Sequence, residues 1–422
     1  MSTADRALPQ TTLPDALREP VRPVSTGWVA RLSLNLVGMW IAWYAPLQVL
    51  LGLHAAALVP DAKELVFGVA TALGGLCSLV ANPLVGALSD RTTSRWGRRV
   101  PWIVGGSLLA AAGFVLLSVA STAALFVAGW CVVQIGLNTM LGALTAFLPD
   151  QVPATQRATV GGVIAMATTV GILAGTGLAT AFGAGRPSPA YLACAAIMLL
   201  FTVPHMTRSG DAPLPAKWRP AGGARVILRG YWISPRRHPD FAWAWLSRLL
   251  INFGNGAGAV YLLFYLQDGV GYPDPAGGVL VLTVIYAVLV LATAVVGGRI
   301  SDRVGRRKVF VVWSGTGIAA ALFALGFQTW TAAVVGACLL GVSFGVYTSV
   351  DLALVTEVLP AAADRAKDLG IVTITSTLPG ILTPVLAALL VTGPGGYPAL
   401  YVCAGLLALT GSAAVTRIRG VR

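Results

Sequence analysis

Two ionisable residues stand inside long apolar stretches of the sequence. Asp351 lies in YTSVDLALVTEVLP, toward the polar end of its stretch, and Arg248 lies near the start of another. A charge within a membrane is costly enough that such residues are functional candidates by default. Burial disfavours an ionised carboxyl, so Asp351 could load and release a coupling proton, or it could be a structural carboxylate paired with a neighbouring helix. Arg248 could be that partner or an anion ligand, or its side chain could snorkel to the interface.

Other apolar stretches carry amide and aromatic side chains that could line a binding cavity. Aromatic faces stack on sugar rings and other planar ligands, and amides supply both hydrogen-bond donors and acceptors. The candidates are Trp40, Tyr44, Gln48, Gln134, Asn138, Asn252, Asn255 and Tyr261. Trp40 and its neighbour Trp43 could instead face lipid, because tryptophan is common at the membrane interface.

A basic loop motif occurs twice in the chain. GALSDR at 86–91, followed by GRR at 97–99, returns half a chain later as GRISDR at 298–303, followed by GRR at 305–307. The glycine permits close helix packing, and the acid can face a helix N-terminus or a partner arginine. Anchoring of a basic loop at the inner membrane surface would explain the arginines but not their repeated spacing. The repeated spacing predicts two homologous halves.

These residues must be positioned by membrane-spanning helices. Of the 422 residues, 56% are hydrophobic and only 11% are charged, against roughly 25% charged in soluble domains. A helix crosses the hydrocarbon core with about 20 residues, and twelve apolar stretches of this length follow one another. The predicted spans are 28–53, 64–89, 100–120, 122–148, 156–183, 189–207, 241–267, 276–300, 308–328, 330–358, 367–392 and 397–417.

The positions of the basic residues predict the orientation of the chain. A net charge of +13 could suggest a nucleic-acid partner, but all 29 lysines and arginines except Lys63, Arg186 and Arg248 lie in or beside the tails and loops of one side. This asymmetry is the positive-inside rule. It predicts a multi-pass protein of the inner, or plasma, membrane with both termini in the cytoplasm. The basic cytoplasmic face would meet anionic lipids, and no nucleic-acid partner is expected.

The chain divides into five segments on these patterns. We expect a disordered cytoplasmic tail at 1–27, a six-helix half at 28–207, a proline-rich basic linker at 208–240, a second six-helix half at 241–417 and a short tail at 418–422. The five cysteines fall inside predicted helices without paired spacing, so we expect no disulfide, metal site or other cofactor.

The two basic loops, GALSDRTTSRWGRRVPWI at 86–103 and GGRISDRVGRRKV at 297–309, resemble the signature loop of the major facilitator superfamily. The resemblance implies an all-α membrane fold of 12 transmembrane helices in two six-helix halves. It also implies cytoplasmic salt bridges that stabilise the outward-open state. The residues it assigns to these bridges are Asp90, Arg91, Arg98, Arg99, Asp302, Arg303, Arg306 and Arg307.

The long first loop is similar to that of the glycoside-pentoside-hexuronide symporters and of the sucrose/proton symporters. The stretch at 122–148 and the residues just after it also match the sucrose-type pattern, with Asn138-Thr139, Gly142, Ala146 and Asp150. The resemblance makes Asn138 the strongest cavity candidate.

The sequence departs from these symporters at the positions that bind their ligands. Asn82 and Ser78 stand where the glycoside symporters carry cation-binding carboxylates, so coupling to sodium is not expected. Gln134 and Thr145 stand where the sucrose type carries an acid and an arginine, which argues against sucrose itself. The glycines at 171–177 lack the proline that is typical of drug/proton antiporters.

We therefore predict a secondary active transporter of a small solute, coupled to protons through Asp351 and Arg248 and working as a monomer. A sugar or glycoside is the favoured substrate, and export of a drug or secondary metabolite is the alternative. The absence of a nucleotide-binding loop and of metal-ligand spacing argues against an enzyme. A non-transporting membrane sensor is the remote alternative, and such a protein would carry a soluble signalling extension.

Overall fold

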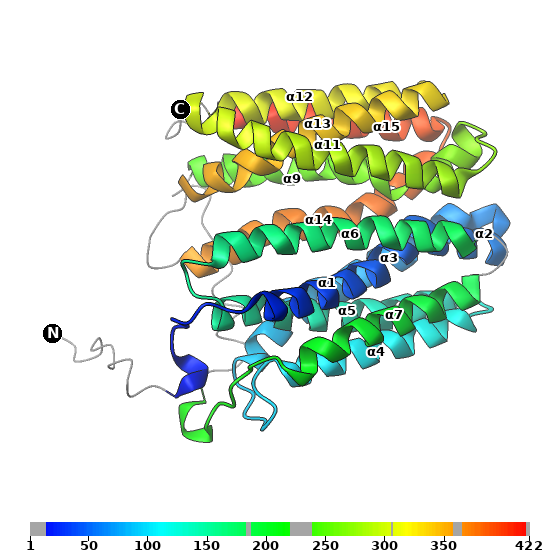
Figure 1. Cartoon of the computed structure of the whole chain (residues 1–422). Coiled ribbons are helices and arrows are strands. Elements are labelled where there is room, and N and C mark those ends of the chain that lie inside the picture. The colour runs from blue at the N-terminus through cyan, green and yellow to red at the C-terminus, as the bar shows by residue number, and fades with distance from the viewer. Residues whose placement is uncertain (1–13, 183–186, 220–238, 305–306, 358–364, 419–422) are drawn as a thin grey trace.

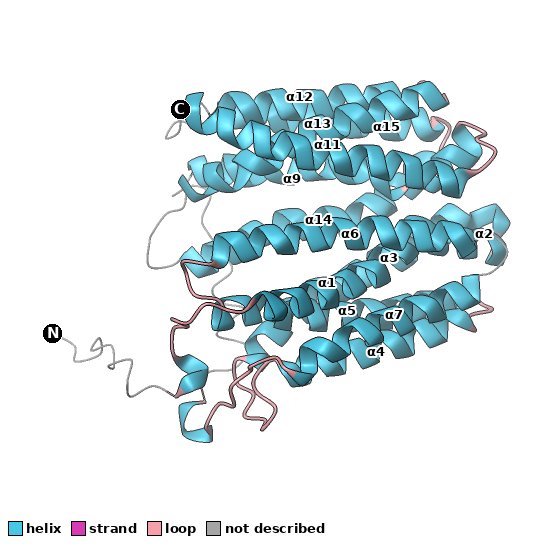
Figure 2. Cartoon of the chain, in the orientation of Figure 1, coloured by secondary structure: helices cyan, strands magenta, loops and turns pink. Residues whose placement is uncertain are grey.

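The computed structural model describes residues 14–182, 187–219, 239–304, 307–357 and 365–418, with side chains for all of these except 158, 302, 352–357 and 365–373. Regular structure in these ranges is entirely helical (Figure 2). Eleven helices are long and apolar enough to cross a membrane, and a bent pair with a 47° angle between its parts forms a twelfth span. The predicted all-α fold with twelve spans is confirmed.

The N-terminal half contains six spans. The first is continuous from α1 (Thr26–Ala45) through a π-helical turn (Pro46–Leu50) into α2 (Leu51–Leu58). The others are α3 (Lys63–Ser89), α4 (Val100–Ser118), α5 (Ala123–Gln151), α6 (Arg157–Phe182) and α7 (Pro187–Thr207).

The C-terminal half also contains six spans. The first is the bent pair, in which α9 (Pro239–Val260) is followed by α10 (Leu262–Phe264) and a π-helical turn (Tyr265–Gly269). The others are α11 (Pro275–Val304), α12 (Arg307–Leu325), α13 (Trp330–Glu357), α14 (Arg365–Val391) and α15 (Gly396–Thr416).

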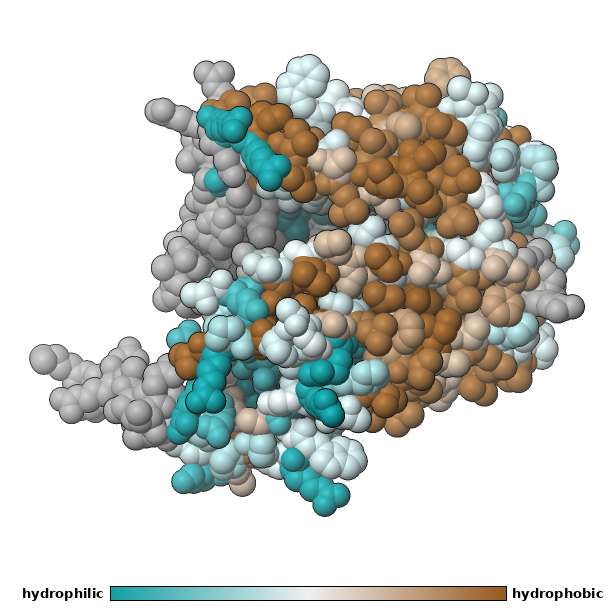
Figure 3. All heavy atoms as spheres, in the orientation of Figure 1, coloured by the Kyte–Doolittle hydropathy of each residue, from teal (hydrophilic) through white to brown (hydrophobic). Residues whose placement is uncertain are grey.

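The spans run side by side, and α1 begins and α15 ends at the same end of the bundle, here called the termini end (Figure 1). The opposite end, which carries α2 and α10, is called the far end. Hydrophobic side chains form a belt across the helices, and hydrophilic ones gather toward the two ends (Figure 3). Lipid is the only solvent that suits such a belt, as shown by Leu200, which is 66% exposed in the middle of α7.

Glycines set the close approach of helices within the N-terminal half. A Cβ atom on Gly113 of α4 would lie 2.6 Å from the backbone nitrogen of Val133 in α5. A Cβ on Gly171 of α6 would lie 2.5 Å from the Cβ of Trp40 in α1. Because lipid is as apolar as the side chains, helices in membranes pack by such short backbone contacts.

The two halves meet where α3 packs against α14 and α6 packs against α11. Polar bonds join the halves at the far end. Lys63 Nζ lies 2.7 Å from Asp268 Oδ2, and the Tyr261 hydroxyl lies 2.9 Å from the backbone oxygen of Glu64. These bonds hold the far ends of the two halves together in the conformation that the structure describes.

The predicted tails and linker are described only in part. Within the 1–27 segment, Asp15–Leu17 forms a single 3-10 turn, and the backbone N–H of Val24 donates to Gln156 Oε1 at 2.8 Å. The predicted linker at 208–240 is described at 208–219 and at 239–240, where α9 begins, and residues 419–422 lie outside the description.

Candidate functional site

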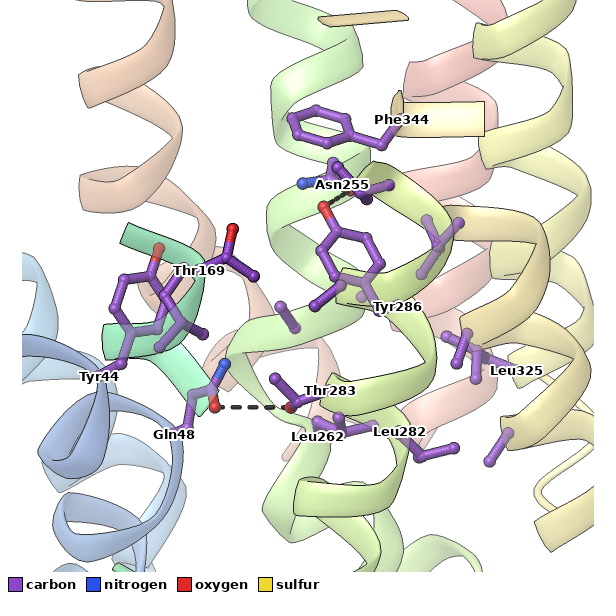
Figure 4. Close-up of a pocket in the computed structure, with 18 residues that line it drawn as sticks. Tyr44, Gln48, Thr169, Asn255, Leu262, Leu282, Thr283, Tyr286, Leu325 and Phe344 are labelled. Atoms are coloured by element: carbon purple, nitrogen blue, oxygen red, sulfur yellow. Dashed lines mark hydrogen bonds between the residues drawn. The ribbon is translucent and has the colours of Figure 1, made fainter. Parts of the chain in front are cut away.

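A cavity of about 380 Å³ lies between the two halves (Figure 4). The N-terminal half contributes Tyr44 and Gln48 from the first span and Thr169 and Ile172 from α6. Lining residues from the C-terminal half come from the bent span, α11, α12 and α13. They are Asn255, Gly258, Ala259, Leu262, Leu282, Thr283, Tyr286, Ala287, Val290, Leu325, Ala333, Ala337, Leu340 and Phe344.

Polar groups from both halves gather on one side of this cavity. Gln48 Oε1 accepts a hydrogen bond from Thr176 and lies 3.5 Å from the Thr283 hydroxyl across the interface. Tyr286 donates its hydroxyl proton to Asn255 Oδ1 at 3.2 Å. Amide and hydroxyl groups of this kind can exchange bonds with a polar, uncharged ligand.

Three of the eight predicted cavity residues, Tyr44, Gln48 and Asn255, line this cavity. Trp40 does not line the cavity but packs against Tyr44, with 5.8 Å between their ring centroids. Asn252, one turn before Asn255, donates from Nδ2 to the backbone oxygen of Arg248 at 2.8 Å.

Tyr261 is fully buried away from this cavity, at the bend between α9 and α10. Its hydroxyl lies within 3.0 Å of the backbone oxygen of Pro384 in α14 as well as near Glu64 in α3. Tyr261 therefore contributes to the junction at the far end.

Gln134 and Asn138 turn toward α3. Asn138 Nδ2 donates to Ser78 Oγ at 2.7 Å, and Ser78 Oγ donates to Gln134 Oε1 at 3.1 Å. All three side chains are buried. Ser78 is one of the positions where the similar symporters carry a cation-binding acid, and here it belongs to a neutral network inside the N-terminal half.

Arg248 and Asp351 form an ion pair between α9 and α13, through Nη1 and Oδ2. The Tyr347 hydroxyl donates to Asp351 Oδ1 at 2.8 Å, and Arg248 Nη2 lies 3.3 Å from Ser376 Oγ in α14. Of the alternatives that the sequence left open for Arg248, the structure shows pairing with Asp351.

The pair is connected to the cavity through aromatic side chains. The ring of Tyr347 lies 5.7 Å from that of Phe344, which lines the cavity and stacks on Tyr286. Tyr347 lies one turn from Asp351 in α13, and Phe344 lies about two turns from it, at the cavity wall.

The first basic loop forms ion pairs among the ends of α3, α4 and α5. Arg99 Nη2 lies 2.5 Å from Asp90 Oδ1, and Arg99 Nε lies 2.9 Å from Asp150 Oδ2. Arg98 Nη2 also lies 2.9 Å from Asp150 Oδ2. Arg91 continues the turn after α3, where its N–H donates to the oxygen of Leu88 at 3.1 Å. These ion pairs run within the N-terminal half.

Asp211, which the sequence analysis did not single out, completes this loop. Its Oδ2 accepts the backbone N–H groups of Arg99 at 2.6 Å and of Val100 at 2.9 Å, and so caps α4, whose own N-cap side chain makes no such bond. Gly97 has φ +98°, and a Cβ there would overlap the side chain of Asp211, so only glycine fits. Burial raises the pKa of Asp211, and the backbone N–H groups and Arg98 oppose that shift.

The second basic loop is described in part. Arg303 lies in the last turn of α11 with an exposed side chain, and Arg307 begins α12. The side chain of Asp302 and all of Arg306 lie outside the described residues. The predicted bridges of this loop stay a prediction.

The sequence analysis missed the polar residues that α11 and α6 bring to the cavity. Thr283 and Tyr286 are polar residues in the most hydrophobic of the candidate spans, and Thr169 lies in the glycine-rich α6. Polar residues in an otherwise apolar helix were an available signal, but the predicted cavity residues came only from the predicted first, fourth and seventh spans.

Twelve spans in two halves, with a cavity between the halves, define a membrane transporter. The model of the Major Facilitator Superfamily matches residues 26–290 and 274–420, and the chain therefore belongs to this superfamily.

Solved transporters share the fold at low sequence identity. The nucleoside transporter NupG aligns with a TM-score of 0.73 and 13% identity over 93% of this chain and 98% of its own. A peptide transporter POT in complex with sulfate aligns with a TM-score of 0.76 and 12% identity over 98% of both chains. The human organic anion transporter MFSD10 aligns with a TM-score of 0.65 and 18% identity over 93% of this chain and 100% of its own.

A short sequence match connects the chain to a curated relative. An uncharacterized symporter of Synechocystis sp. is 50% identical over 36 residues, which are 8% of this chain and 7% of that relative. The match covers only a small fraction of either protein.

Proposed function

We propose that the protein is a proton-coupled secondary transporter of a small uncharged polar solute, with a sugar or glycoside as the favoured substrate. It would work by alternating access, as a monomer in the inner, or plasma, membrane, with both termini in the cytoplasm. The observation that carries the proposal is the cavity between the halves, whose polar groups come from both of them.

The chemistry of the cavity favours an uncharged ligand. Among the described residues that line it there is no acidic or basic side chain, whereas Gln48, Asn255, Thr283 and Tyr286 offer donors and acceptors. A charged ligand would lose its hydration shell there without gaining an opposite charge. Ring hydroxyls of a sugar can pair with amides and tyrosine hydroxyls.

The contacts at the far end suggest how access alternates. Lys63 pairs with Asp268, and Tyr261 reaches Glu64, so that each bond joins one half to the other. Opening the far end requires these bonds to break while the two halves rock about the cavity. The described conformation would then expose the cavity toward the termini end, which the basic loops assign to the cytoplasm.

The ion pair between Arg248 and Asp351 supplies the coupling step. A proton on Asp351 Oδ2 cancels the carboxylate charge and releases Arg248, and the aromatic contact from Tyr347 to Phe344 carries the change to the cavity. Proton release restores the pair, since a lone buried guanidinium is costly.

Transport by purified protein in liposomes tests the proposal. We would measure uptake of neutral sugars, simple glycosides and hydrophobic cations, with and without a pH gradient at constant ionic strength. Accumulation of a neutral glycoside that disappears when the gradient is collapsed is the expected result. Accumulation of cations alone would contradict the proposed substrate, and accumulation that ignores the pH gradient would contradict the coupling.

Export of a drug or secondary metabolite is the second candidate, and the large apolar share of the cavity wall favours it. Liposomes that contain the protein in one orientation would separate the two directions. Accumulation driven only by a proton gradient opposed to the solute flux would support export.

A further inference from the structure

The cavity extends from its polar side into an apolar recess within the C-terminal half. The recess is formed by Leu325 of α12 and by Ala333, Ala337 and Leu340 of α13, which are 2%, 1%, 8% and 6% exposed. Figure 4 places Leu325 on the opposite side of Tyr286 from Tyr44 and Gln48. The recess is therefore part of the cavity and is separated from the polar residues of the N-terminal half.

Small residues leave the space that forms this recess. Ala333 and Ala337 are four residues apart and so share one face of α13. Gly258 of α9 also lines the cavity, and a Cβ there would lie 2.8 Å from Leu340 Cδ1. Larger side chains at these three positions would fill the recess. Because α12 and α13 pack on α9, α11 and α15, the recess is enclosed by protein.

The chemistry of the recess differs from that of the polar side. Its walls are hydrocarbon, so a hydroxyl placed there would lose its bonds to water without replacement. An alkyl or aryl group placed there gains from leaving water, in proportion to its apolar area. A free sugar would satisfy Gln48, Asn255 and Tyr286 but would leave the recess unused.

We propose that the recess between α12 and α13 binds an apolar group of the ligand, so that the substrate is an uncharged amphipathic molecule such as a glycoside with an aryl or alkyl aglycone. The polar part lies against Gln48, Asn255 and Tyr286, and the apolar part lies against Leu325 and Ala337. This inference rests on the proposed function, because it assigns the substrate class of the same cavity.

Binding of three probes to the purified full-length protein in lipid nanodiscs tests the inference. The probes are phenyl β-glucoside, methyl β-glucoside and a neutral phenyl amide without a sugar, with affinities measured by calorimetry. Ala337→Leu fills the recess, and Val335→Leu, at a 45% exposed position on the lipid side of the same helix, is the matched control.

The expected result is that phenyl β-glucoside binds the parent and the Val335→Leu variant at least about tenfold more tightly than methyl β-glucoside. In Ala337→Leu this preference should fall below about threefold, while methyl β-glucoside binds as in the parent. A parent that binds both glucosides with equal affinity, or a preference that survives Ala337→Leu, overturns the inference. Failure of every probe to bind overturns it as well.

The probes also separate this inference from the proposed function. If both glucosides bind equally and independently of residue 337, and liposomes accumulate both, the recess proposal fails and the sugar transporter stands. If only the phenyl amide binds, and Ala337→Leu abolishes that binding, the recess proposal stands and the proposed sugar substrate is wrong.

Discussion

The two ends of the molecule use ion pairs in different ways. At the termini end, Arg98 and Arg99 pair with Asp90 and Asp150, all within the N-terminal half. At the far end, Lys63 pairs with Asp268 of the other half. A bond within one half moves with that half during rocking, whereas a bond between the halves must break when its end opens.

This difference indicates which state each set of bonds favours. The far-end pair is closed in the described conformation and stabilises it. Asp90 is half exposed, at 52% of its side chain, so it remains available for a contact with the other half when the termini end closes. We therefore expect the two sets of ion pairs to act as opposed latches, each of which stabilises the state in which its own end is closed. The signature loop would then stabilise the outward-open state, in which the termini end is closed.

The largest effect is expected at the ion pair of Arg248 and Asp351, which lies within the C-terminal half and carries the charge that would couple transport to protons. In Asp351→Asn the amide oxygen can still accept the hydrogen bond of the Tyr347 hydroxyl, but the negative charge that pairs with Arg248 is lost. Uphill accumulation should fall to simple equilibration, a loss of about tenfold for a one-unit pH gradient, because one pH unit corresponds to about 1.4 kcal/mol per proton. Downhill exchange of the same solute should persist.

Counterflow and pH-driven uptake, measured on the same proteoliposomes, check this expectation. Tyr347→Phe is the control, since it removes a bond to Asp351 without removing the titrating group. Uphill accumulation by Asp351→Asn would exclude the coupling role. Loss of exchange together with accumulation would identify the pair as structural.

The next effect is a shift between states when the far-end latch is opened. Lys63→Met removes a partly exposed pair of the kind that contributes about 0.5–1 kcal/mol, so the population of the outward-open state should rise about two- to fivefold. Distances between spin labels at Ala57 and Pro273, on the two halves at the far end, would report the shift. The double change Lys63→Asp with Asp268→Lys should restore the parent distribution, and an unchanged distribution in Lys63→Met would refute the latch.

A smaller effect of opposite sign is expected at the termini end. Asp90→Asn removes the exposed acid while Asp150 still holds Arg99, so the fold should be retained. The outward-open population should fall by about twofold, as expected for one exposed charge, and transport should slow. The same spin-label pair measures it, and a ratio equal to that of the parent would disprove a gating role for Asp90.

The sequence predicted the spans well because their length is fixed by the membrane and their apolar content is continuous. The predicted stretch at 100–120, for example, is observed as Val100–Ser118. The bend at Tyr261 was not predicted, since it depends on packing: a Cβ on Gly52 would lie 2.7 Å from Leu263, so the two halves touch there.

The sequence left few physical alternatives for some of the site residues. Arg248 and Asp351 were expected to matter because each is costly alone in an apolar stretch, and the structure pairs them. Asn138 had more alternatives, because α5 is apolar around its circumference and its rotation cannot be read from the sequence; it bonds to Ser78. Asp211 was missed because its partners are more than a hundred positions away along the chain.

The smallest effect on the balance between the two states is expected at Asp211, whose bonds also stay within the N-terminal half. Burial raises the pKa of Asp211 above its ordinary value of 3.8, so the folded protein binds the proton more tightly than the unfolded chain does. The stability that this proton provides is present at low pH and is lost as the pH rises from 3.8 through the folded pKa. Asp211→Asn keeps an oxygen that accepts the N–H groups of Arg99 and Val100, and should flatten this dependence without loss of stability at pH 7.

Asp211→Ala removes the cap and should cost about 1 kcal/mol. Unfolding temperatures of the three proteins between pH 4 and 7 measure both effects, and spin-label distances unchanged in either variant would show that the cap holds one half together without selecting a state. A parent and Asp211→Asn with the same pH dependence would mean that this carboxyl does not titrate differently on folding.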